Sequence, residues 1–329
     1  MANYDDMSDD ELWDEMERSN NFEKGQILFE LGRRKAGEHE HLQSLAYFSQ
    51  AADVYRNSTF EREYGIALLY KGNAHHAIEE YQAAIDLYIE CALITKTLGS
   101  DSEVALVEHN TARSYAELGL WADAARHSGA AEHLYVACEI YSQAADAAMM
   151  NGGMHRRMGD YHEAVHSFLR AHQHAAGLES IYNAYRAIRN LAQMYIATGL
   201  YDDAISNARE ALHLGKTCAC PQCVPDSQLL LAQALIGAQQ YEVALQYLEK
   251  AHSTYNAQSK AGEQGICLLE IGRCQSAMGH PGARETLEEA QSILRTVNWT
   301  HSLSRTISAL ADLDSSEGKL ADARQKLQQ

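Results

Sequence analysis

The segment at residues 161–172, YHEAVHSFLRAH, has the residue types and spacing of a zinc hydrolase site. His162, Glu163 and His166 follow the pattern HExxH, in which two histidines one helical turn apart bind zinc and the glutamate acts as general base. His172 follows where one large subgroup of these enzymes has its third ligand. The pattern alone would therefore indicate a metal-dependent hydrolase.

A second candidate for chemistry is the segment TCACPQC at residues 217–223. Its three thiols, Cys218, Cys220 and Cys223, are close enough in sequence to contribute to a tetrahedral zinc site, with His213 or Cys267 as a fourth ligand. The spacing differs from that of the common zinc knuckles, and no second CxxC follows. A structural zinc site and a reduced or redox-prone loop both remain open here.

Composition restricts the class of protein. The chain has 329 residues, three prolines and a formal net charge of −18. This charge argues against nucleic acid as a partner, because phosphates would be repelled. No apolar run approaches the ~18 residues that span a bilayer. The acidic start of the chain is unlike a secretory leader, so we expect a cytoplasmic protein with reduced cysteines and no membrane association.

An internal repeat organises the helices that carry these residues. Seven segments share a turn residue followed by alanines seven residues apart, as in GDYHEAVHSFLRA at 159–171 and GLYDDAISNAREA at 199–211. From Ala124 onward the first alanines are spaced by 40, 40, 40, 39 and 40 residues. The first alanines are Ala77, Ala124, Ala164, Ala204, Ala244, Ala283 and Ala323.

A second small residue lies upstream of each turn. These positions are Gly65, Ala112, Gly152, Ala192, Ala232, Gly272 and Ala311. Two amphipathic helices per repeat, with small residues where they cross, can approach closely, and neighbouring hairpins must stack to bury their apolar faces. The pattern predicts an all-α fold of seven to eight helical hairpins at residues 22–329, after an acidic segment at 1–21.

This pattern resembles the tetratricopeptide repeat (TPR), whose unit has small, aromatic and alanine positions in the same order. The period exceeds the usual ~34 residues, as in long-repeat, peptide-binding members of the family. The resemblance implies a right-handed superhelical solenoid without strands. It also implies that the first helix of each hairpin lines a concave groove.

The repeat frame accounts for the HExxH segment. Ala164, Phe168 and Ala171 occupy packing positions of a second helix, so His162 and His166 are expected on its solvent side. Leu169 stands where a glycine would be needed to turn the chain and bring His172 back toward the pair. We therefore interpret the motif as a coincidence on an exposed helix face and predict no catalytic residue there.

Basic residues concentrate in the sector predicted to face the groove. Eight arginines and no lysines fall there, against four acids, in a chain with 45 acidic and 27 basic residues. Arginine suits forked hydrogen bonds to carboxylates or phosphates. The arginines are Arg62, Arg113, Arg156, Arg157, Arg186, Arg189, Arg273 and Arg305, and the acids are Glu117, Asp146, Asp226 and Asp312.

Two asparagines, Asn110 and Asn190, precede their small residues by two positions. The TPR resemblance implies that asparagines at such positions hold the backbone of a peptide ligand. The alternative for the arginines is that they pair with acids of neighbouring repeats and only tie the array together. Because Arg156, Arg157, Arg186 and Arg189 belong to consecutive repeats, we expect them to form one patch.

The acidic N-terminal segment contains a short predicted helix. Ser8 and Glu11 have the spacing of a capping box, and Leu12, Trp13 and Met16 form an apolar edge. This helix could cap the array or act as a docking segment or internal pseudo-ligand.

Taken together, these patterns predict a non-catalytic protein–protein interaction module. It would bind an acidic or extended peptide segment of a partner in an arginine-lined groove. The alternatives are a scaffold that self-associates as a homo-oligomer through its terminal repeats, a peptide-sensing regulator, and an enzyme that uses the cysteine cluster with a metal. The pattern also resembles bacterial peptide-pheromone receptors built on such arrays. Those that regulate transcription have an N-terminal helix-turn-helix, and residues 1–21 are too short and too acidic to form one.

Overall fold

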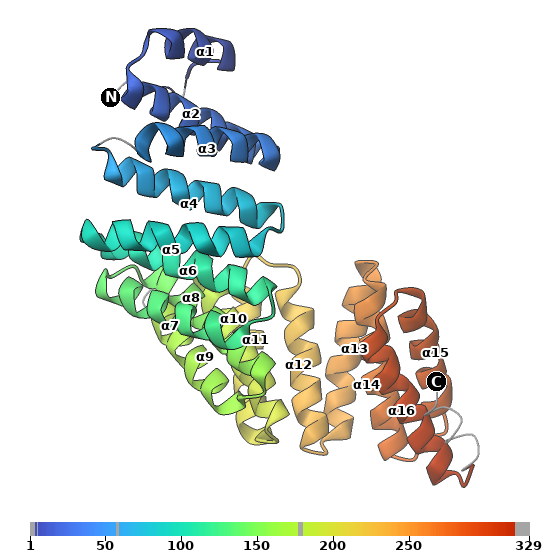
Figure 1. Cartoon of the computed structure of the whole chain (residues 1–329). Coiled ribbons are helices and arrows are strands. Elements are labelled where there is room, and N and C mark those ends of the chain that lie inside the picture. The colour runs from blue at the N-terminus through green and yellow to red at the C-terminus, as the bar shows by residue number, and fades with distance from the viewer. Residues whose placement is uncertain (1–3, 5, 57–58, 177–179, 320–329) are drawn as a thin grey trace. The chain divides into compact units, whose positions relative to one another are not determined.

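The computed structural model describes residues 4, 6–56, 59–176 and 180–319. Within these residues the regular secondary structure is entirely α-helical, and successive helices are joined by short turns wherever the connection is described (Figure 1). The predicted all-α fold of tandem hairpins is confirmed. No helix in the described ranges is both long and apolar enough to cross a bilayer.

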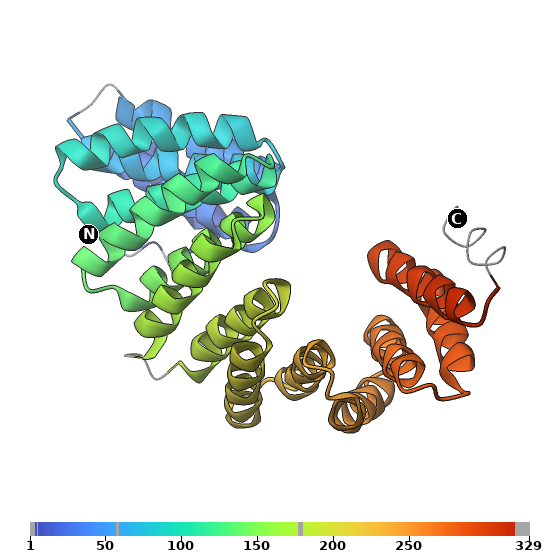
Figure 2. The ribbon, with the colours of Figure 1, turned by 90° about the horizontal axis from the view of Figure 1, so that it is seen from below.

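The chain divides into two compact units, Met1–Leu178 and Glu179–Gln329. The helices of unit 1 are α1 (Asp9–Arg18), α2 (Asn21–Gly37), α3 (His41–Arg56), α4 (Glu61–Ala77), α5 (Tyr81–Thr97), α6 (Asp101–Glu117), α7 (Trp121–Ala137), α8 (Tyr141–Met158) and α9 (Tyr161–Ala176). The described helices of unit 2 are α10 (Ile181–Ala197), α11 (Tyr201–Thr217), α12 (Cys223–Gly237), α13 (Tyr241–Ala257), α14 (Ala261–Ala277), α15 (Ala283–Thr296) and α16 (Thr300–Ser316). Within unit 2 these helices follow one another along an arc (Figure 2).

The turns follow a period of half a repeat. Residues with a left-handed backbone recur at intervals of 20 or 40 from His39 to Gly279, and include Glu79, Gly99, Gly119 and Gly159. At Gly159, the amide N–H groups of Gly159 and Asp160 donate to the carbonyls of Arg156 and His155, respectively. This is a Schellman C-cap, which satisfies carbonyls at the end of α8. The 40-residue repeat therefore consists of two helices of about equal length, and most described helices are closed by the same kind of turn.

Within a hairpin, a small residue of the first helix faces a large residue of the second. A Cβ added at Gly152 would lie 2.7 Å from the Phe168 ring, and one at Gly72 would lie 2.5 Å from the Tyr88 ring. Phe168 and Tyr88 are each 1% exposed. These contacts bring the helix backbones close together, as the small-residue pattern predicted.

The register of the first strong copy differs from the sequence prediction. Gly72 faces Tyr88 and is therefore the small crossing residue, whereas Gly65 lies nearer the start of α4, against Ile94. Ala77 is the last residue of α4, and the buried alanine that begins the packing pattern of α5 is Ala84. The error has a physical cause. Alanines seven residues apart look the same after a shift of two helical turns, and the left-handed turn residue here is a glutamate, Glu79, instead of glycine.

The corrected register extends the 40-residue period toward the N-terminus. Gly32 packs against Phe48 as Gly72 packs against Tyr88. The segment with Ser44 and Ala51 forms α3, and both residues are fully buried. The last predicted copy, at 318–327 with Ala323, lies almost entirely outside the described residues.

The acidic N-terminal segment forms α1, and its capping box between Ser8 and Glu11 is present. Leu12 is buried against Ile27 and Leu31 of α2, and Asp9 pairs with Arg34, whose Nη1 lies 3.1 Å from Asp9 Oδ1. The apolar edge of α1 thus covers α2 at the start of unit 1.

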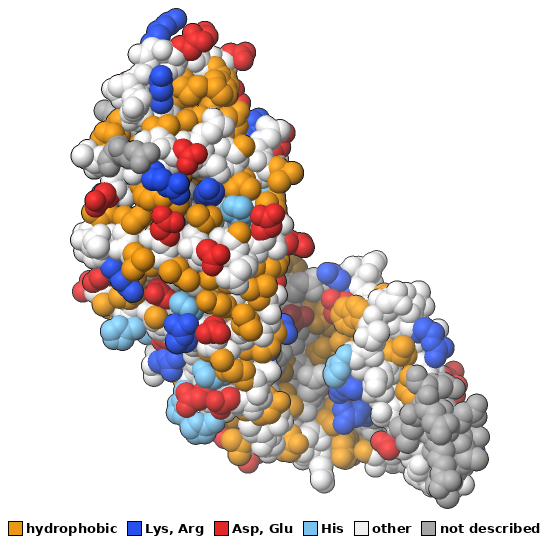
Figure 3. Space-filling view, in the orientation of Figure 1, with side chains coloured by type: hydrophobic (Ala, Val, Ile, Leu, Met, Phe, Trp, Pro, Cys, Tyr) orange, Lys and Arg blue, Asp and Glu red, His pale blue; other side chains and the backbone are white. Residues whose placement is uncertain are grey.

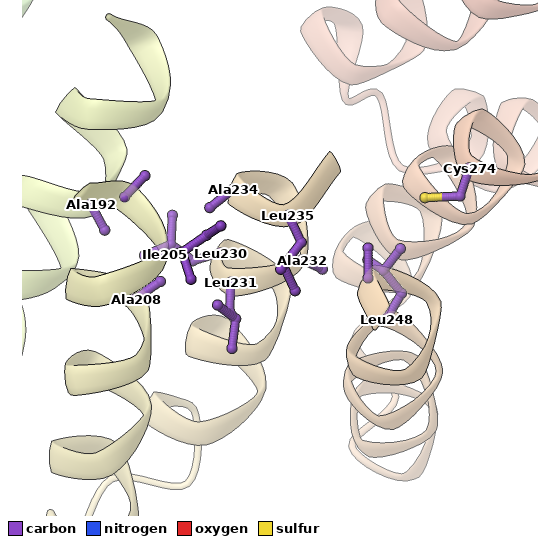
Figure 4. Packing of buried hydrophobic residues seen from close by; sticks show 12 residues of the cluster. Ala192, Ile205, Ala208, Leu230, Leu231, Ala232, Ala234, Leu235, Leu248 and Cys274 are labelled. Atoms are coloured by element: carbon purple, nitrogen blue, oxygen red, sulfur yellow. The ribbon is translucent and has the colours of Figure 1, made fainter. Parts of the chain in front are cut away.

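The core cluster around α12 in unit 2 consists mainly of small and branched aliphatic side chains. Leu230, Leu231 and Leu235 of α12 lie between Ile205 of α11 and Leu248 of α13 (Figure 4). Alanines fill the closest helix contacts. This packing holds the first helices of successive hairpins at fixed spacing, which matters for the residues they expose.

We expect Phe168→Ala to lower the free energy of unfolding by about 3–5 kcal/mol, because it leaves a cavity against Gly152. Urea unfolding followed by circular dichroism measures this. His166→Ala, on the exposed side of the same helix, is the control and should change stability by no more than about 0.5 kcal/mol. Equal effects of the two substitutions would contradict this packing.

Candidate functional site

A polar hollow of unit 2 lies on its first helices. It has a volume of about 420 Å³. Its walls come from α10, α12, α14 and α16, with tyrosines from the starts of α11 and α13. The lining residues are Ile196, Tyr201, Gln233, Ile236, Gly237, Tyr241, Glu270, Arg273, Ala277 and Arg305. We call this surface the first-helix pocket.

Glu270 forms the charged base of the first-helix pocket. Its side chain is fully buried and accepts hydrogen bonds from Arg273 Nη1 at 2.7 Å and Arg305 Nη2 at 2.6 Å. Gln233 Nε2 lies 3.3 Å from Glu270 Oε1. The two arginine side chains remain 43% and 36% exposed. Two guanidinium groups share one carboxylate, so the cluster carries one net positive charge and has donors left over toward solvent.

The other wall of the first-helix pocket is apolar and aromatic. Ile196 and Ile236 lie on it, and the ring of Tyr201 rests on the backbone of Gly237. A Cβ at position 237 would be 2.1 Å from this ring, so the tyrosine occupies space that any larger residue would take. The pocket therefore combines an apolar wall with a cationic base, as is common in sites that bind small ligands or peptide side chains.

A second hollow of about 290 Å³ adjoins the first and shares Arg273 and Arg305 with it. It is otherwise lined by α16 residues, among them His301, Ser304, Ser308 and Asp312. The two arginines thus line both hollows, and Ser304 and Ser308 contribute hydroxyl groups to the second one.

The remaining predicted groove residues of unit 2 lie on α10. Arg186 and Arg189 are half-buried, and the Arg186 guanidinium lies 6.0 Å from the centre of the Tyr182 ring. Asn190 Nδ2 donates to the carbonyl of Arg186 in its own helix at 2.9 Å. One of its two amide hydrogens is therefore already used.

The predicted groove residues of unit 1 have different surroundings. Arg113 is exposed next to His76 and His109; burial lowers the pKa of both histidines, and the charge of Arg113 lowers it further. Asn110 is 8% exposed, and its Nδ2 donates to Asn73 Oδ1 at 3.2 Å. Asn110 is thus part of a polar contact between α4 and α6.

Arg156 and Arg157, near the end of α8, are exposed. The Arg157 guanidinium lies 4.8 Å from the centre of the Trp121 ring, a cation–π contact with the first residue of α7. These two arginines belong to unit 1, whereas Arg186 and Arg189 belong to unit 2. The patch expected from all four stays a prediction.

Two of the predicted groove arginines form ion pairs with acids of a neighbouring repeat, which was the alternative to ligand binding. Arg62 pairs with Glu103 at 2.8 Å, between α4 and α6, and Arg305 pairs with Glu270 across α14 and α16. Glu270 was not predicted as a site residue, because glutamates are rarely buried. The spacing of Glu270 and Arg273 could have indicated the pair. Glu30 and Arg33 are also three residues apart, and Arg33 Nε lies 2.8 Å from Glu30 Oε2.

The HExxH residues lie on the solvent side of α9, as predicted. The side chains of His162 and Glu163 are 81% and 53% exposed, and the ring centres of His162 and His166 are 4.6 Å apart. Histidine side chains gather over α7 and α9, with acidic side chains between them (Figure 3). In the described part of the chain, no group of three or more His, Cys, Asp or Glu residues is arranged to hold a metal ion.

The three cysteines of the α11–α12 connection lie close together. Cys223 is buried as the first residue of α12, and its thiol contacts those of Cys218 and Cys220. The hydrogen bond with Cys223, together with the backbone N–H groups of Gln222 and Cys223, lowers the pKa of Cys220. Burial raises the pKa of Cys223. Zinc at this cluster stays a prediction.

The fold and the pocket together define a TPR-like array whose first helices carry the candidate binding surface. Solved structures support this class. The apo form of the quorum sensor NprR from B. thuringiensis matches with a TM-score of 0.70 at 14% sequence identity, covering 97% of this chain and 90% of that chain. Aspartyl phosphate phosphatase F from Bacillus subtilis matches with a TM-score of 0.64 at 15% identity, covering 97% and 86%.

A third similar structure is the Rap conjugation gene regulator of the plasmid pLS20 in complex with a peptide. Its TM-score is 0.52 at 13% identity, with 92% of this chain and 93% of that chain covered. No protein-family model matches the sequence, and no curated protein shows a significant match to it. At these identities the similarity establishes the TPR-like fold.

We expect Glu270→Gln to destabilise the protein by about 1.5–3 kcal/mol, because two arginines lose their shared carboxylate while a buried polar group remains. Thermal and urea unfolding measure the change. Glu288→Gln, exposed on α15, removes the same charge and should have an effect within about 0.5 kcal/mol. A silent Glu270→Gln would mean that the cluster does not tie α14 to α16.

Proposed function

We propose that this protein is a non-catalytic interaction module that binds an acidic or extended peptide segment of a partner protein on its first helices. The observation that carries the proposal is the cluster of Arg273 and Arg305 on one buried carboxylate, Glu270. A ligand carboxylate placed there would accept the remaining guanidinium donors and complete the charge balance. Glu270 already holds both guanidinium groups in the structure, so these donors are in place before a ligand binds.

The chemistry of the pocket walls favours a peptide over a small inorganic anion. Ile196, Ile236 and the tyrosines Tyr201 and Tyr241 can bury an apolar side chain beside the bound carboxylate. Aromatic and arginine side chains are the types most often found at the energetic centre of protein interfaces. Arg186 and Arg189, with Asn190, would extend the same surface along α10.

The comparisons support this class of ligand. The array shares its fold with a protein solved in complex with a peptide and with a quorum sensor, which favours a peptide-sensing regulator as the finer form of the proposal. All seven cysteines are free, which supports residence in the cytoplasm. The scaffold alternative, self-association through the terminal repeats, predicts a homo-oligomer with or without peptide.

Fluorescence polarisation with short labelled peptides rich in Asp and Glu tests the proposal, with the same sequences carrying Asn and Gln as controls. We expect wild-type protein to bind acidic peptides at least about tenfold more tightly than their amide counterparts, and less tightly as salt rises. Analytical ultracentrifugation in parallel should show a monomer. Equal binding of both peptide sets, or a peptide-independent oligomer, would favour the scaffold.

The triple variant Glu270→Gln, Arg273→Gln and Arg305→Gln locates the site. It removes one net positive charge without leaving a buried charge unpaired, so the fold should tolerate it better than single changes. Peptide affinity should fall at least about tenfold. Arg209→Gln removes the same net charge from the exposed side of α11 and should bind as wild type does.

Reversal of Arg186 and Arg189 to Glu tests how far the surface extends. We expect it to abolish binding of the acidic peptides while the helical melting curve changes little. Loss of binding in this variant together with full binding by the triple variant would move the site from the first-helix pocket to α10.

A further inference from the structure

The connection between α11 and α12 differs from most of the described turns of the array. Cys218 takes an extended backbone, with φ −78° and ψ 144°, in place of the left-handed turn that closes most other helices. The chain then forms a tight turn in which the Cys223 amide N–H donates to the Cys220 carbonyl at 3.2 Å. This turn places Cys220 and Cys223 at its two ends, next to the start of α12.

The backbone around Cys223 is held from several directions. Its carbonyl accepts from Ser227 Oγ at 2.7 Å and from Tyr185 Oη at 3.2 Å. A Cβ on Gly215 would lie 3.0 Å from the same carbonyl oxygen. Gln222 Nε2 donates to Gln258 Oε1 of the next hairpin at 2.9 Å. Cys223 is therefore a fixed, buried thiol that its neighbours Cys218 and Cys220 contact.

The two half-buried thiols differ in their surroundings. Cys218 Sγ donates to the carbonyl of Gly215 at 3.4 Å, in the last turn of its own helix. Cys220 lies in the connection itself, just before the first turn of α12. Cys220 is accessible to solvent, whereas Cys223 is not. An accessible thiol beside a buried one is the arrangement of an attacking and a resolving cysteine.

We propose that Cys220 and Cys223 form a reversible disulfide, with Cys220 as the thiol that an oxidant reaches first. With hydrogen peroxide, the Cys220 sulfur attacks one peroxide oxygen and the O–O bond breaks. Cys220 becomes a sulfenic acid, and the leaving hydroxide takes the thiol proton to form water. The Cys223 sulfur then attacks the Cys220 sulfur. The S–S bond forms, the S–O bond breaks, and the departing hydroxide takes the Cys223 proton as a second water.

The redox balance of this sequence is complete. The two sulfurs lose two electrons in total, and the peroxide oxygens gain them. A dithiol reductant reverses the reaction through a mixed disulfide on Cys220, the accessible sulfur. The disulfide would join the middle of the α11–α12 connection to the first residue of α12, where the left-handed turn that follows most other described helices is absent. The proposal is independent of peptide binding, since none of these residues lines the first-helix pocket.

Peptide mass spectrometry of the full-length protein tests the disulfide. Reduced protein is treated with hydrogen peroxide, free thiols are alkylated, and the protein is digested with trypsin. Residues 217–250 form one tryptic peptide with Cys218, Cys220 and Cys223 as its cysteines. We expect this peptide to lose two hydrogens, with one remaining alkylation site at Cys218. Free thiols should fall from seven to five and return to seven with dithiothreitol.

Two variants at half-buried positions distinguish the roles of the thiols. Cys220→Ser should abolish the disulfide, whereas Cys218→Ser, the matched control, should form it at the wild-type rate. Circular dichroism checks that both variants fold. A disulfide between Cys218 and Cys223, or oxidation of Cys220→Ser at the wild-type rate, would overturn the proposal. One equivalent of zinc that is retained by the purified protein and blocks oxidation would also overturn it, in favour of a structural metal.

Discussion

The close approach of two helices within each hairpin is the contact on which this structure depends. Gly32, Gly72 and Gly152 each leave room for an aromatic ring of the following helix, and Gly272 does the same for Leu287. A side chain at any of these glycines would enter the space of a buried residue, so the backbones could no longer approach. This approach sets the angle of the hairpin. It therefore determines which residues of the first helix are buried and which can face a ligand.

The regular spacing explains how much could be predicted from the sequence. A hairpin of two helices needs a small crossing residue, a packing stripe and a turn, and these recur every 40 residues from Ala112 to Gly272. The predicted register was wrong at the first copy. Glu79 replaces the turn glycine there, and alanines seven residues apart allow the copy to be aligned two helical turns out of place. The division into two units was not predicted, because the residues around it keep the same period.

Charge partners were harder to predict than helix packing. The repeat pattern predicted Arg273 and Arg305 on the first helices, and both line the first-helix pocket. Glu270 was not predicted. It lies two residues before the crossing glycine, at a position that asparagine occupies in two other copies. Whether a glutamate at such a position is buried depends on two arginines, one of them 35 residues away. Sequence shows that the charges exist, whereas only the fold shows that they share a contact.

This sharing changes what an arginine-rich groove can do. An arginine with an exclusive carboxylate is largely neutralised, and a ligand would have to break that pair. At Glu270 two arginines use one carboxylate, so an incoming carboxylate adds a partner without displacing one. Glu30 in unit 1 is also shared, by Arg33 and Arg34, but Arg34 additionally pairs with Asp9 of α1. The chain's own acidic helix therefore supplies the second carboxylate in unit 1. Among the described residues of unit 2, Arg273 and Arg305 pair only with Glu270, and the proposed ligand would supply the second carboxylate there.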